Sequence, residues 1–385
     1  MQKVVIASDS FKGSLSSMEV ADYVCAGIHE VFPECKVIKI SMADGGEGML
    51  SAIAGNIEGE RIYADVHDPL GRCIQAEYLI HDMDGSRTAI IEMAKASGLT
   101  LLKPDERNPL KASSYGTGEL IMEAFGRGCR RFIIGLGGSA VNDGGGGMLE
   151  AIGFRFYDHD GNVITGINGS SLKYIYDINT ELADKEFLDS EFIAACDVEA
   201  TFTGPEGASH VFSAQKGADQ AMTEELERGM KTFGEAIDRK FGCRISEVKG
   251  AGAAGGLGGA LYACLEAELK KGSELVLDTI GFDDLIKNAD LVITGEGKID
   301  FQTFLGKAPA GVAARATRYG IPTIAIGGIV ETDYPVSSIF HAVLSIGKKP
   351  ENQEELETAM RPDIAKNRIR KTISEYFSIF YAKKS

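Results

Sequence analysis

Acidic side chains follow short apolar runs at several places in this sequence, and glycines surround most of them. The acids concerned are Asp9, Asp44, Glu47, Asp143, Asp197, Glu296 and Asp300. An apolar run that stops at a glycine turn and leads into a helical pattern is typical of a strand-to-helix junction in an α/β fold. The carboxyl ends of parallel strands form one edge of a sheet, where open sheets bind ligands. We therefore expect these acids to converge.

Converging carboxylates repel one another unless a cation lies among them. Mg²⁺ accepts a few carboxylates together with water and phosphate oxygens. Asp143 and Asp197 are the candidates for Mg²⁺ ligation and for the general base, with the division between them open and Glu296 as an alternative base. A single acid in a glycine turn is explained equally well as a turn or capping residue.

The stretch LGGSAVNDGGGGMLEAIG, residues 136–153, holds the densest group of glycines. Glycine loops can bind phosphates through backbone N–H groups, because no side chain blocks the approach. The predicted nucleotide-binding set, completed by an acid and a lysine further along the chain, is Gly137, Gly138, Ser139, Asn142, Gly144, Gly145, Glu296 and Lys307.

Three lysines stand beside glycines: Lys12, Lys216 and Lys307. A lysine at a strand end can reach a phosphate or a substrate carboxylate as a compact charge. Phosphoryl transfer needs positioning, charge neutralisation and a base for the attacking hydroxyl. We therefore add Lys12 to Asp143 and Asp197 as a catalytic candidate.

Composition limits the function classes. The chain has 385 residues, 44% of them hydrophobic, which is enough for two domains with compact cores. The net charge of −16 gives no basic footprint for nucleic acid or an anionic membrane. No apolar run approaches the roughly 20 residues of a membrane span, and the start lacks a signal-peptide pattern, so we expect a cytoplasmic protein. The seven cysteines form no C-x-x-C, which argues against a disulfide framework or zinc site.

The expected fold class is α/β with two domains and an active site in the cleft between them. A Rossmann-like parallel-sheet domain is predicted from 1–59, 115–200 and 284–385. The second domain, predicted from 60–114 and 201–283, begins with period-two runs that indicate an antiparallel meander over 60–94. A single C-terminal helix is expected over 353–380, and Ser14 or Ser16 should cap the first helix.

A dinucleotide fold is the main alternative. GLGGSA at 135–140 and GAGAAG at 250–255 match the glycine fingerprint, and Asp158 lies about 20 residues beyond the first. Against this, Asp143 would lie beside the pyrophosphate with no cation to offset it. Close helix packing through small residues explains the second stretch equally well. The segment FQTFLGKAP lacks the first glycine and the Ser or Thr of a P-loop.

Ordered blocks along the chain resemble the type I bacterial glycerate kinase family. The blocks are ASDSFKGSLSSMEVA, MADGGEG, GGSAVNDGG, ACDVEATFTGPEGASHVFSAQKGA, KGAGAAGGLGGAL and GEGKIDFQTFLGKAPAGVA. The resemblance implies phosphorylation of D-glycerate with ATP and Mg²⁺, at the 2-hydroxyl to give 2-phosphoglycerate. It leaves the oligomeric state open.

Under this resemblance, Lys12 with Asp9 and Ser10 would hold the glycerate carboxylate and hydroxyls. Asp44, Glu47 and Lys216 complete the expected substrate-binding set. The sequence departs from the family at Ala200–Thr201–Phe202, where Asn-Pro-Leu is usual. That departure places substrate preference in question and keeps open a glycerate-binding homologue without catalysis. The glycine fingerprints keep open an NAD(P)-dependent oxidoreductase of a small hydroxy acid.

Overall fold

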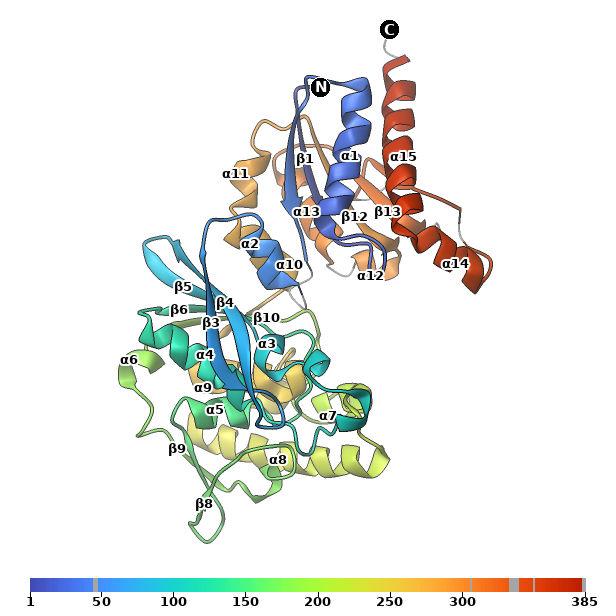
Figure 1. The fold of residues 1–385 in the computed structure, drawn as a ribbon. Coiled ribbons are helices and arrows are strands. Elements are labelled where there is room, and N and C mark those ends of the chain that lie inside the picture. The colour runs from blue at the N-terminus through green and yellow to red at the C-terminus, as the bar shows by residue number, and fades with distance from the viewer. Residues whose placement is uncertain (44–47, 305–306, 332–338, 349, 383–385) are drawn as a thin grey trace. The chain divides into compact units, whose positions relative to one another are not determined.

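The computed structural model describes residues 1–43, 48–304, 307–331, 339–348 and 350–382 (Figure 1). The chain forms two compact units. The first unit comprises Met1–Asp44, Ser51–Ile57 and Ser273–Ser385, and the second comprises Gly45–Leu50 and Glu58–Gly272. The second unit is thus an almost continuous insertion into the first.

The first unit contains a five-stranded, fully parallel sheet in the order β14-β13-β12-β1-β2. Its strands are β1 (Lys3–Ser8), β2 (Lys36–Ser41), β12 (Leu291–Ile299), β13 (Thr323–Val330) and β14 (Ala342–Ser345). The apolar residues of β1 are completely buried, as expected for a strand of a parallel sheet with both faces covered. The predicted Rossmann-like parallel sheet is therefore confirmed.

Helix α1 (Ser17–Val31) follows the first strand and begins with a reciprocal cap. Ser16 is the N-cap: its side chain accepts from the Glu19 N–H, and the Glu19 carboxylate accepts from the Ser16 N–H. Gly27 lets α1 approach α15 (Pro362–Ala382), since a Cβ there would lie 2.6 Å from the Arg370 carbonyl oxygen. The two helices run side by side in Figure 1.

The C-terminal helical region is two helices and not the single one expected. Helix α14 (Gln353–Met360) ends before Arg361, whose backbone is extended at φ −58° and ψ 128°. Pro362 then begins α15. The break has a local cause, because proline lacks an N–H and disfavours helical backbone in the residue before it. The other helices of this unit are α10 (Gly272–Thr279), α11 (Phe282–Ile286), α12 (Phe301–Phe304) and α13 (Ala308–Arg318), while α2 (Met49–Ala54) crosses the unit boundary.

The second unit contains a six-stranded mixed sheet in the order β11-β10-β6-β5-β4-β3. Its strands are β3 (Glu60–His67), β4 (Cys73–Met83), β5 (Ser86–Glu92), β6 (Arg131–Gly135), β10 (Glu191–Ala195) and β11 (Glu268–Lys270). Strands β3, β4 and β5 form the predicted antiparallel meander. The remaining pairs are parallel.

This sheet corrects the expected domain boundaries and the expected convergence of the acids. Because β6 pairs with β5 in the second unit, residues 115–200 belong with the meander and not with the sheet of the first unit. Asp9 and Glu296 therefore lie at the end of one sheet, whereas Asp143 and Asp197 follow strands of the other. The sequence patterns located strand ends correctly but carried no information on which strands share a sheet.

Helices surround this sheet, and a small antiparallel sheet, β8-β7-β9, completes the unit. Those strands are β7 (Arg155–Tyr157), β8 (Val163–Ile164) and β9 (Asp177–Asn179). The helices are α3 (Ala94–Ser97), α4 (Tyr115–Gly126), α5 (Gly146–Ala151), α6 (Lys185–Leu188), α7 (Ala208–Phe212), α8 (Gln220–Phe241) and α9 (Leu257–Leu265). Short 3₁₀ helices occupy Leu99–Leu101, Pro104–Glu106, Leu172–Tyr174, Ala214–Lys216, Ile245–Glu247 and Ala253–Gly256.

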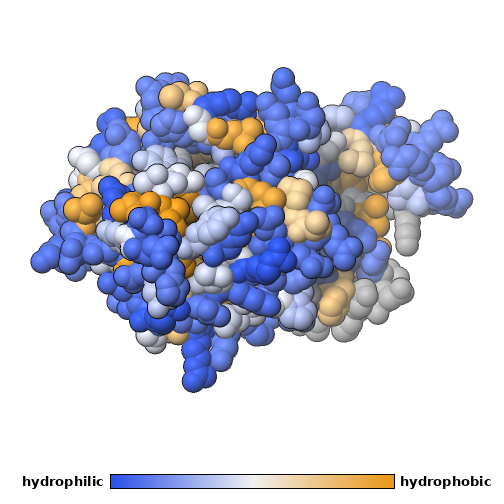
Figure 2. Space-filling model, turned by 90° about the horizontal axis from the view of Figure 1, so that it is seen from below, coloured by the Kyte–Doolittle hydropathy of each residue, from blue (hydrophilic) through white to orange (hydrophobic). Residues whose placement is uncertain are grey.

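The face of the molecule in Figure 2 is mainly hydrophilic, with apolar side chains in separate areas. In the parts of the chain that the structure describes, no helix is both long and apolar enough to cross a bilayer.

Candidate active site

A pocket of about 330 Å³ opens in the first unit at the carboxyl ends of β1 and β12. It brings together six of the residues predicted from the sequence: Asp9, Ser10, Lys12, Glu296, Asp300 and Lys307. These residues meet because β1 and β12 are parallel neighbours, with Ser8 opposite Gly295. Residues predicted to bind substrate and residues predicted to bind nucleotide therefore share one pocket.

Two buried carboxylates line this pocket. Glu296 is 7% exposed; its Oε1 accepts from Thr303 Oγ1 at 2.5 Å and its Oε2 lies 3.0 Å from Lys307 Nζ. Asp9 is also 7% exposed, and its Oδ1 accepts from the Ser10 N–H at 2.6 Å. Both carboxylates are thus oriented by neighbours that belong to the same unit.

Five cationic side chains line the pocket: Lys12, Lys298, Lys307, Lys348 and Arg368. Only Lys12 and Lys307 were predicted from the sequence. Lys307 is paired with Glu296, and Lys298 lies 3.1 Å from Asp300. Within the described ranges, Lys12, Lys348 and Arg368 line the pocket without an ion pair. These three unpaired cations create a positive region suited to an anionic ligand.

Helix α14 contributes apolar side chains to the pocket. These are Leu356, Ala359 and Met360. A pocket with one apolar wall and a few convergent polar groups is typical of small-molecule sites. Lys348 follows Gly347 just after β14, a setting like that of Lys12, and sequence reasoning missed it. Arg368 and the apolar residues lie on helices, where no glycine turn marks them.

Asp143, the central predicted acid of the second unit, is completely buried. Its Oδ2 accepts from the Ser114 N–H at 2.7 Å, from Ser114 Oγ at 2.8 Å and from the Gly147 N–H at 3.2 Å. Its Oδ1 accepts from the Gly145 N–H at 3.1 Å. Burial raises the pKa of Asp143, while these hydrogen bonds oppose the rise. The carboxylate therefore organises the loop around it.

Lys216 is buried with Asp143 in the second unit. It is 2% exposed, and its Nζ donates to the Val141 carbonyl oxygen at 2.6 Å. Burial lowers the pKa of Lys216 to about 7, against the opposing charge of Asp143. A lysine sealed in this way holds the backbone before Asn142 in place, and the expected contact with substrate stays a prediction.

The glycine loop that follows β6 divides into two parts. Gly137, Gly138 and Ser139 are at least partly exposed. Gly144 and Gly145 are buried, and their N–H groups donate to the Gly255 carbonyl and to Asp143. Only the first part offers accessible backbone to a phosphate in this structure.

Asn142 is fully buried between the two glycine segments. Its Nδ2 donates to Ser209 Oγ at 3.3 Å. Its Oδ1 has no hydrogen-bond partner within the described part of the chain. The side chain is thus only half satisfied.

The second glycine stretch explains why so much bare backbone is needed. Gly255, at φ +68°, lies against the first loop, where a Cβ would come within 2.1 Å of the Val141 carbonyl oxygen. A Cβ on Gly256 would lie 2.7 Å from the Cα of Gly144. The glycines at 250–259 therefore serve close packing, as the structural alternative for this stretch predicted.

The dinucleotide alternative loses its main support. Asp158, the acid expected at a ribose, accepts hydrogen bonds from the Asp160 and Asn162 N–H groups and orders the turn between β7 and β8. The stretch at 250–255 follows a 3₁₀ helix and not a strand. The first fingerprint follows strand β6 but has no free acid at Asp158, and the second lacks the preceding strand that dinucleotide binding requires.

The predicted metal site was also tested against the residues. Asp197 is exposed and accepts from the Gly272 N–H at 2.8 Å. Across the described residues, no group of three or more His, Cys, Asp or Glu side chains is arranged to hold a metal ion. The buried Asp143, whose oxygens face protein donors, does not fit a metal ligand. Asp44 and Glu47 lie outside the described residues.

A parallel-sheet unit with a cation-lined pocket at its strand ends, joined to a second α/β unit, is an arrangement suited to phosphotransferase chemistry. Comparison with known proteins defines the class. The profile of the Glycerate kinase family matches residues 4–379. The chain belongs to the glycerate kinase family and is an enzyme of the kinase class.

The most similar relatives span almost the whole chain. A protein named glycerate kinase from Bacillus cereus is 44% identical over 92% of both chains. A glycerate 2-kinase from Escherichia coli is 43% identical over 90% of this chain and 91% of its own. A crystal structure from Salmonella typhimurium, assigned to glycerate kinase 2, has 40% identity and a TM-score of 0.85, and the match covers 100% of this chain and 99% of that chain.

Proposed function

We propose that this chain transfers the γ-phosphoryl group of ATP to the 2-hydroxyl of D-glycerate and releases 2-phosphoglycerate. The family and the Escherichia coli relative support the substrate and the position. The observation on the molecule that supports it is the pocket of the first unit, with Lys12, Lys348 and Arg368 free of ion pairs within the described residues. Glycerate and ATP are both anionic, so each needs such neutralisation.

We divide the pocket between the two ligands. The apolar wall formed by Leu356, Ala359 and Met360 suits the flat face of a purine. Lys348 and Arg368, which also line the pocket, suit the polyphosphate, because an ammonium group and a guanidinium fork are both phosphate-binding groups. The nucleotide would therefore span from α14 toward the ends of β12 and β13.

Asp9, Ser10 and Lys12 at the end of β1 are proposed to meet glycerate. The Lys12 ammonium complements the substrate carboxylate, and the Asp9 carboxylate can accept from a substrate hydroxyl. Because Asp9 is fixed by the Ser10 N–H, it can orient that hydroxyl without first losing conformational freedom.

Glu296 is the proposed general base. Of the three acids considered as the base, Asp143, Asp197 and Glu296, Glu296 is the one that lines the pocket. Its Oε2 lies 3.0 Å from Lys307 Nζ. A bound polyphosphate would draw the Lys307 ammonium toward itself, which frees Oε2 to accept the proton of the attacking hydroxyl. Thr303 would keep the carboxylate oriented through Oε1.

Mg²⁺ is proposed to arrive bound to ATP, whose phosphate oxygens and water supply most of its ligands. When bound, it would neutralise charge on the transferring phosphoryl group. Asp143 is assigned no contact with the metal, because it is completely buried. The metal role of Asp197 and the phosphate role of Gly137–Ser139, which belong to the second unit, stay separate predictions.

The direct test measures ADP release from ATP and Mg²⁺ with and without D-glycerate. The product position follows from phosphorus-31 coupling, because a 2-phosphate couples to the single proton on C2 and gives a doublet, whereas a 3-phosphate gives a triplet. A triplet would overturn the proposed position. Glycerate binding without ADP release would identify a non-catalytic homologue, and tight NAD(P)H binding would favour the oxidoreductase.

The role of the base is tested by Glu296→Gln. We expect kcat to fall by about 100-fold or more, because general base catalysis contributes roughly 10² to 10⁴ in rate. Glu331→Gln is the matched control, since Glu331 pairs with Lys298 but does not line the pocket. Equal activities for the two variants would remove Glu296 as the base.

A further inference from the structure

A cysteine, a histidine and a glutamate of the second unit contact one another in sequence, away from the glycine loops and the buried acids. His67 ends β3 and Cys73 begins β4, and the two are directly opposite in the antiparallel pair. Cys73 Sγ lies 3.8 Å from His67 Nε2, and His67 Nδ1 lies 2.8 Å from Glu119 Oε1. Cys73 is exposed and the His67 side chain is 40% exposed, so a small molecule can reach both.

The hydrogen bonds determine which nitrogen of His67 carries the proton. Glu119 Oε2 accepts from the His67 backbone N–H at 2.7 Å, so the carboxylate holds both the backbone and the ring. A carboxylate only accepts hydrogen bonds, and therefore Nδ1 is the protonated nitrogen of the neutral ring. Nε2 is left with its lone pair toward the Cys73 thiol. The arrangement is that of a nucleophile, a base and an orienting carboxylate.

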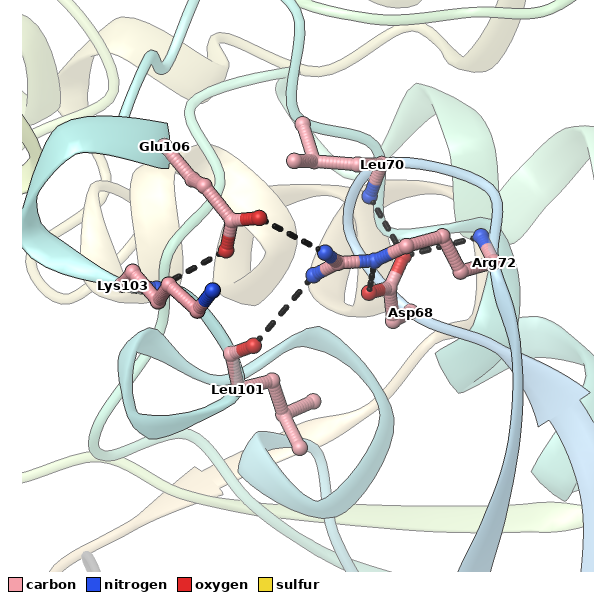
Figure 3. Close-up of polar contacts among 6 residues, drawn as sticks. All are labelled: Asp68, Leu70, Arg72, Leu101, Lys103 and Glu106. Atoms are coloured by element: carbon pink, nitrogen blue, oxygen red, sulfur yellow. Dashed lines mark hydrogen bonds and ion pairs between the residues drawn. The ribbon is translucent and has the colours of Figure 1, made fainter.

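The turn between His67 and Cys73 is fixed by a second network, shown in Figure 3. The Asp68 carboxylate accepts from the N–H groups of Leu70 and Arg72 at 2.8 and 2.9 Å, and from Arg72 Nε at 2.5 Å. Arg72 Nη1 also donates to Glu106 Oε1 at 2.8 Å. This network keeps the ends of β3 and β4 in register.

Helix α4 fixes the other side of the histidine. Gly116, in its first turn, lies against β3 so closely that a Cβ would be 1.9 Å from the His67 carbonyl oxygen. Glu119 follows one turn later on the same helix. The distance between the carboxylate and the imidazole is therefore set by backbone packing.

The three residues form a relay and not a metal site. Cys73 and Glu119 contact opposite nitrogens of the same ring, so they cannot share one ion between them. Among the residues that the structure describes, no three His, Cys, Asp or Glu side chains are arranged to hold a metal ion.

A second cysteine–histidine contact in the first unit provides a natural comparison. Cys25 Sγ lies 3.7 Å from His29 Nδ1, but His29 Nε2 faces the Cys35 carbonyl oxygen at 3.0 Å, where His67 has a carboxylate. Burial raises the pKa of the Cys25 thiol. Cys25 therefore has the imidazole contact without the charged orienting group and without full exposure.

We propose that Cys73 is a site of covalent thiol modification, at which His67 accepts the thiol proton and the thiolate attacks a low-molecular-weight disulfide. A bond forms between Cys73 Sγ and one sulfur of the disulfide, and the bond between the two disulfide sulfurs breaks. The leaving thiolate takes the proton from His67 Nε2. The product is a mixed disulfide, and the electrons balance because one disulfide replaces another.

The test exposes the full-length protein to oxidised glutathione and follows the adduct by intact and peptide mass spectrometry. We expect the first adduct on Cys73, formed about 10-fold faster than on Cys25, and a loss of about 10-fold in its rate in His67→Gln. Cys73→Ser should remove this adduct, and His29→Gln is the matched control that leaves its rate unchanged. A first adduct on another cysteine, or a wild-type rate in folded His67→Gln, would overturn the proposal.

Glu119 is a positioning residue in this proposal, and Glu119→Gln tests it separately. Nitrogen-15 spectra of the His67 ring should show the proton on Nδ1 in the wild type and a mixture of tautomers in the variant, with slower adduct formation. If both the spectrum and the rate remained those of the wild type, the carboxylate would have no part in the reaction. This variant also decides the matter should His67→Gln fail to fold.

Discussion

The two glycine-rich strand ends that first suggested a ligand site have opposite environments. DSFKGS, after β1, opens onto a pocket with unpaired cations, whereas SAVNDGGGG, after β6, is sealed against a second glycine segment. DSFKGS contains Asp9, Lys12 and one glycine, whereas SAVNDGGGG contains Asp143 and four glycines and is contacted by Lys216 from further along the chain. The difference shows that glycine at a strand end has two uses: admitting a ligand to the backbone and admitting another backbone.

The two uses of glycine can be separated by substitution, and the largest loss of stability is expected for Gly255→Ala. The new Cβ would meet the Val141 carbonyl oxygen at 2.1 Å, and the residue would keep a positive φ. We expect the free energy of unfolding of the second unit to fall by about 3–5 kcal/mol. Gly242→Ala is the control, because Gly242 also has positive φ but nothing within 4 Å of its Cβ position, and it should cost about 1 kcal/mol. Equal losses in urea denaturation would mean that packing does not explain the glycines.

Asp143→Asn should have the next largest effect. Its two oxygens accept four hydrogen bonds, and an amide would turn an N–H₂ group toward at least one backbone donor of Ser114, Gly145 or Gly147. We expect a loss of about 2–4 kcal/mol in the free energy of unfolding. Asp197→Asn, at an exposed site, should cost under about 1 kcal/mol. A wild-type stability with greatly reduced kcat would instead return Asp143 to the catalytic group.

Lys216→Met tests whether the buried lysine of this loop makes the free energy of unfolding depend on pH. The pKa of Lys216 is about 7 in the folded state and 10.5 in the reference state, so the unfolded chain binds more protons between those values. The wild-type free energy of unfolding should therefore rise with pH, by on the order of 2 kcal/mol from about pH 7 to about pH 9. The variant should lose this rise, while Lys36→Met, at an exposed position, should retain it. Identical pH slopes for all three proteins would show that Lys216 is not desolvated.

The smallest expected effect concerns the open loop. Lys12→Ala should raise the KM for D-glycerate by roughly 10-fold and leave the KM for ATP near its wild-type value, because one charge-assisted contact to the carboxylate is removed. Lys36→Ala serves as the control for loss of an exposed lysine of the same unit. A rise in the KM for ATP alone would move Lys12 to the phosphates.

Local features of the fold were predictable from the sequence because their causes are local. The cap of α1 depends on Ser16 and Glu19, three residues apart, and the meander on alternation within each strand. The break between α14 and α15 was missed although Pro362 signals it, because the apolar pattern continues past it. The partition of strands between two sheets depends on contacts between distant residues, which no local pattern encodes.

The candidate site was predictable only in part for the same reason. Asp9, Lys12, Glu296 and Lys307 were found because they flank strand ends, whereas Arg368 reaches the pocket from a helix that has no motif.

The unusual triplet at 200–202 was expected to bear on substrate choice. In the structure, the Ala200 carbonyl accepts from two glycine N–H groups, at Gly250 and Gly252. Phe202 is fully buried, and the Cβ position of Gly259 lies 2.7 Å from its ring. The Thr201 N–H donates to the Glu206 carbonyl, which a proline there would prevent. These contacts relate the triplet to the packing of the glycine segments, and its effect on substrate choice stays a prediction.

The central place of β1 in its sheet has a consequence for biosynthesis. This strand pairs on one side with β12, which is translated almost 290 residues later according to the pairing of Val4 with Leu291. The nearly continuous second unit can be completed and can fold in the interval, since domains generally fold as units during synthesis. One edge of β1 lacks its partner throughout that time, and an unpaired apolar strand is a site of aggregation. The nascent first unit should therefore depend on chaperones for longer than the unit inserted into it.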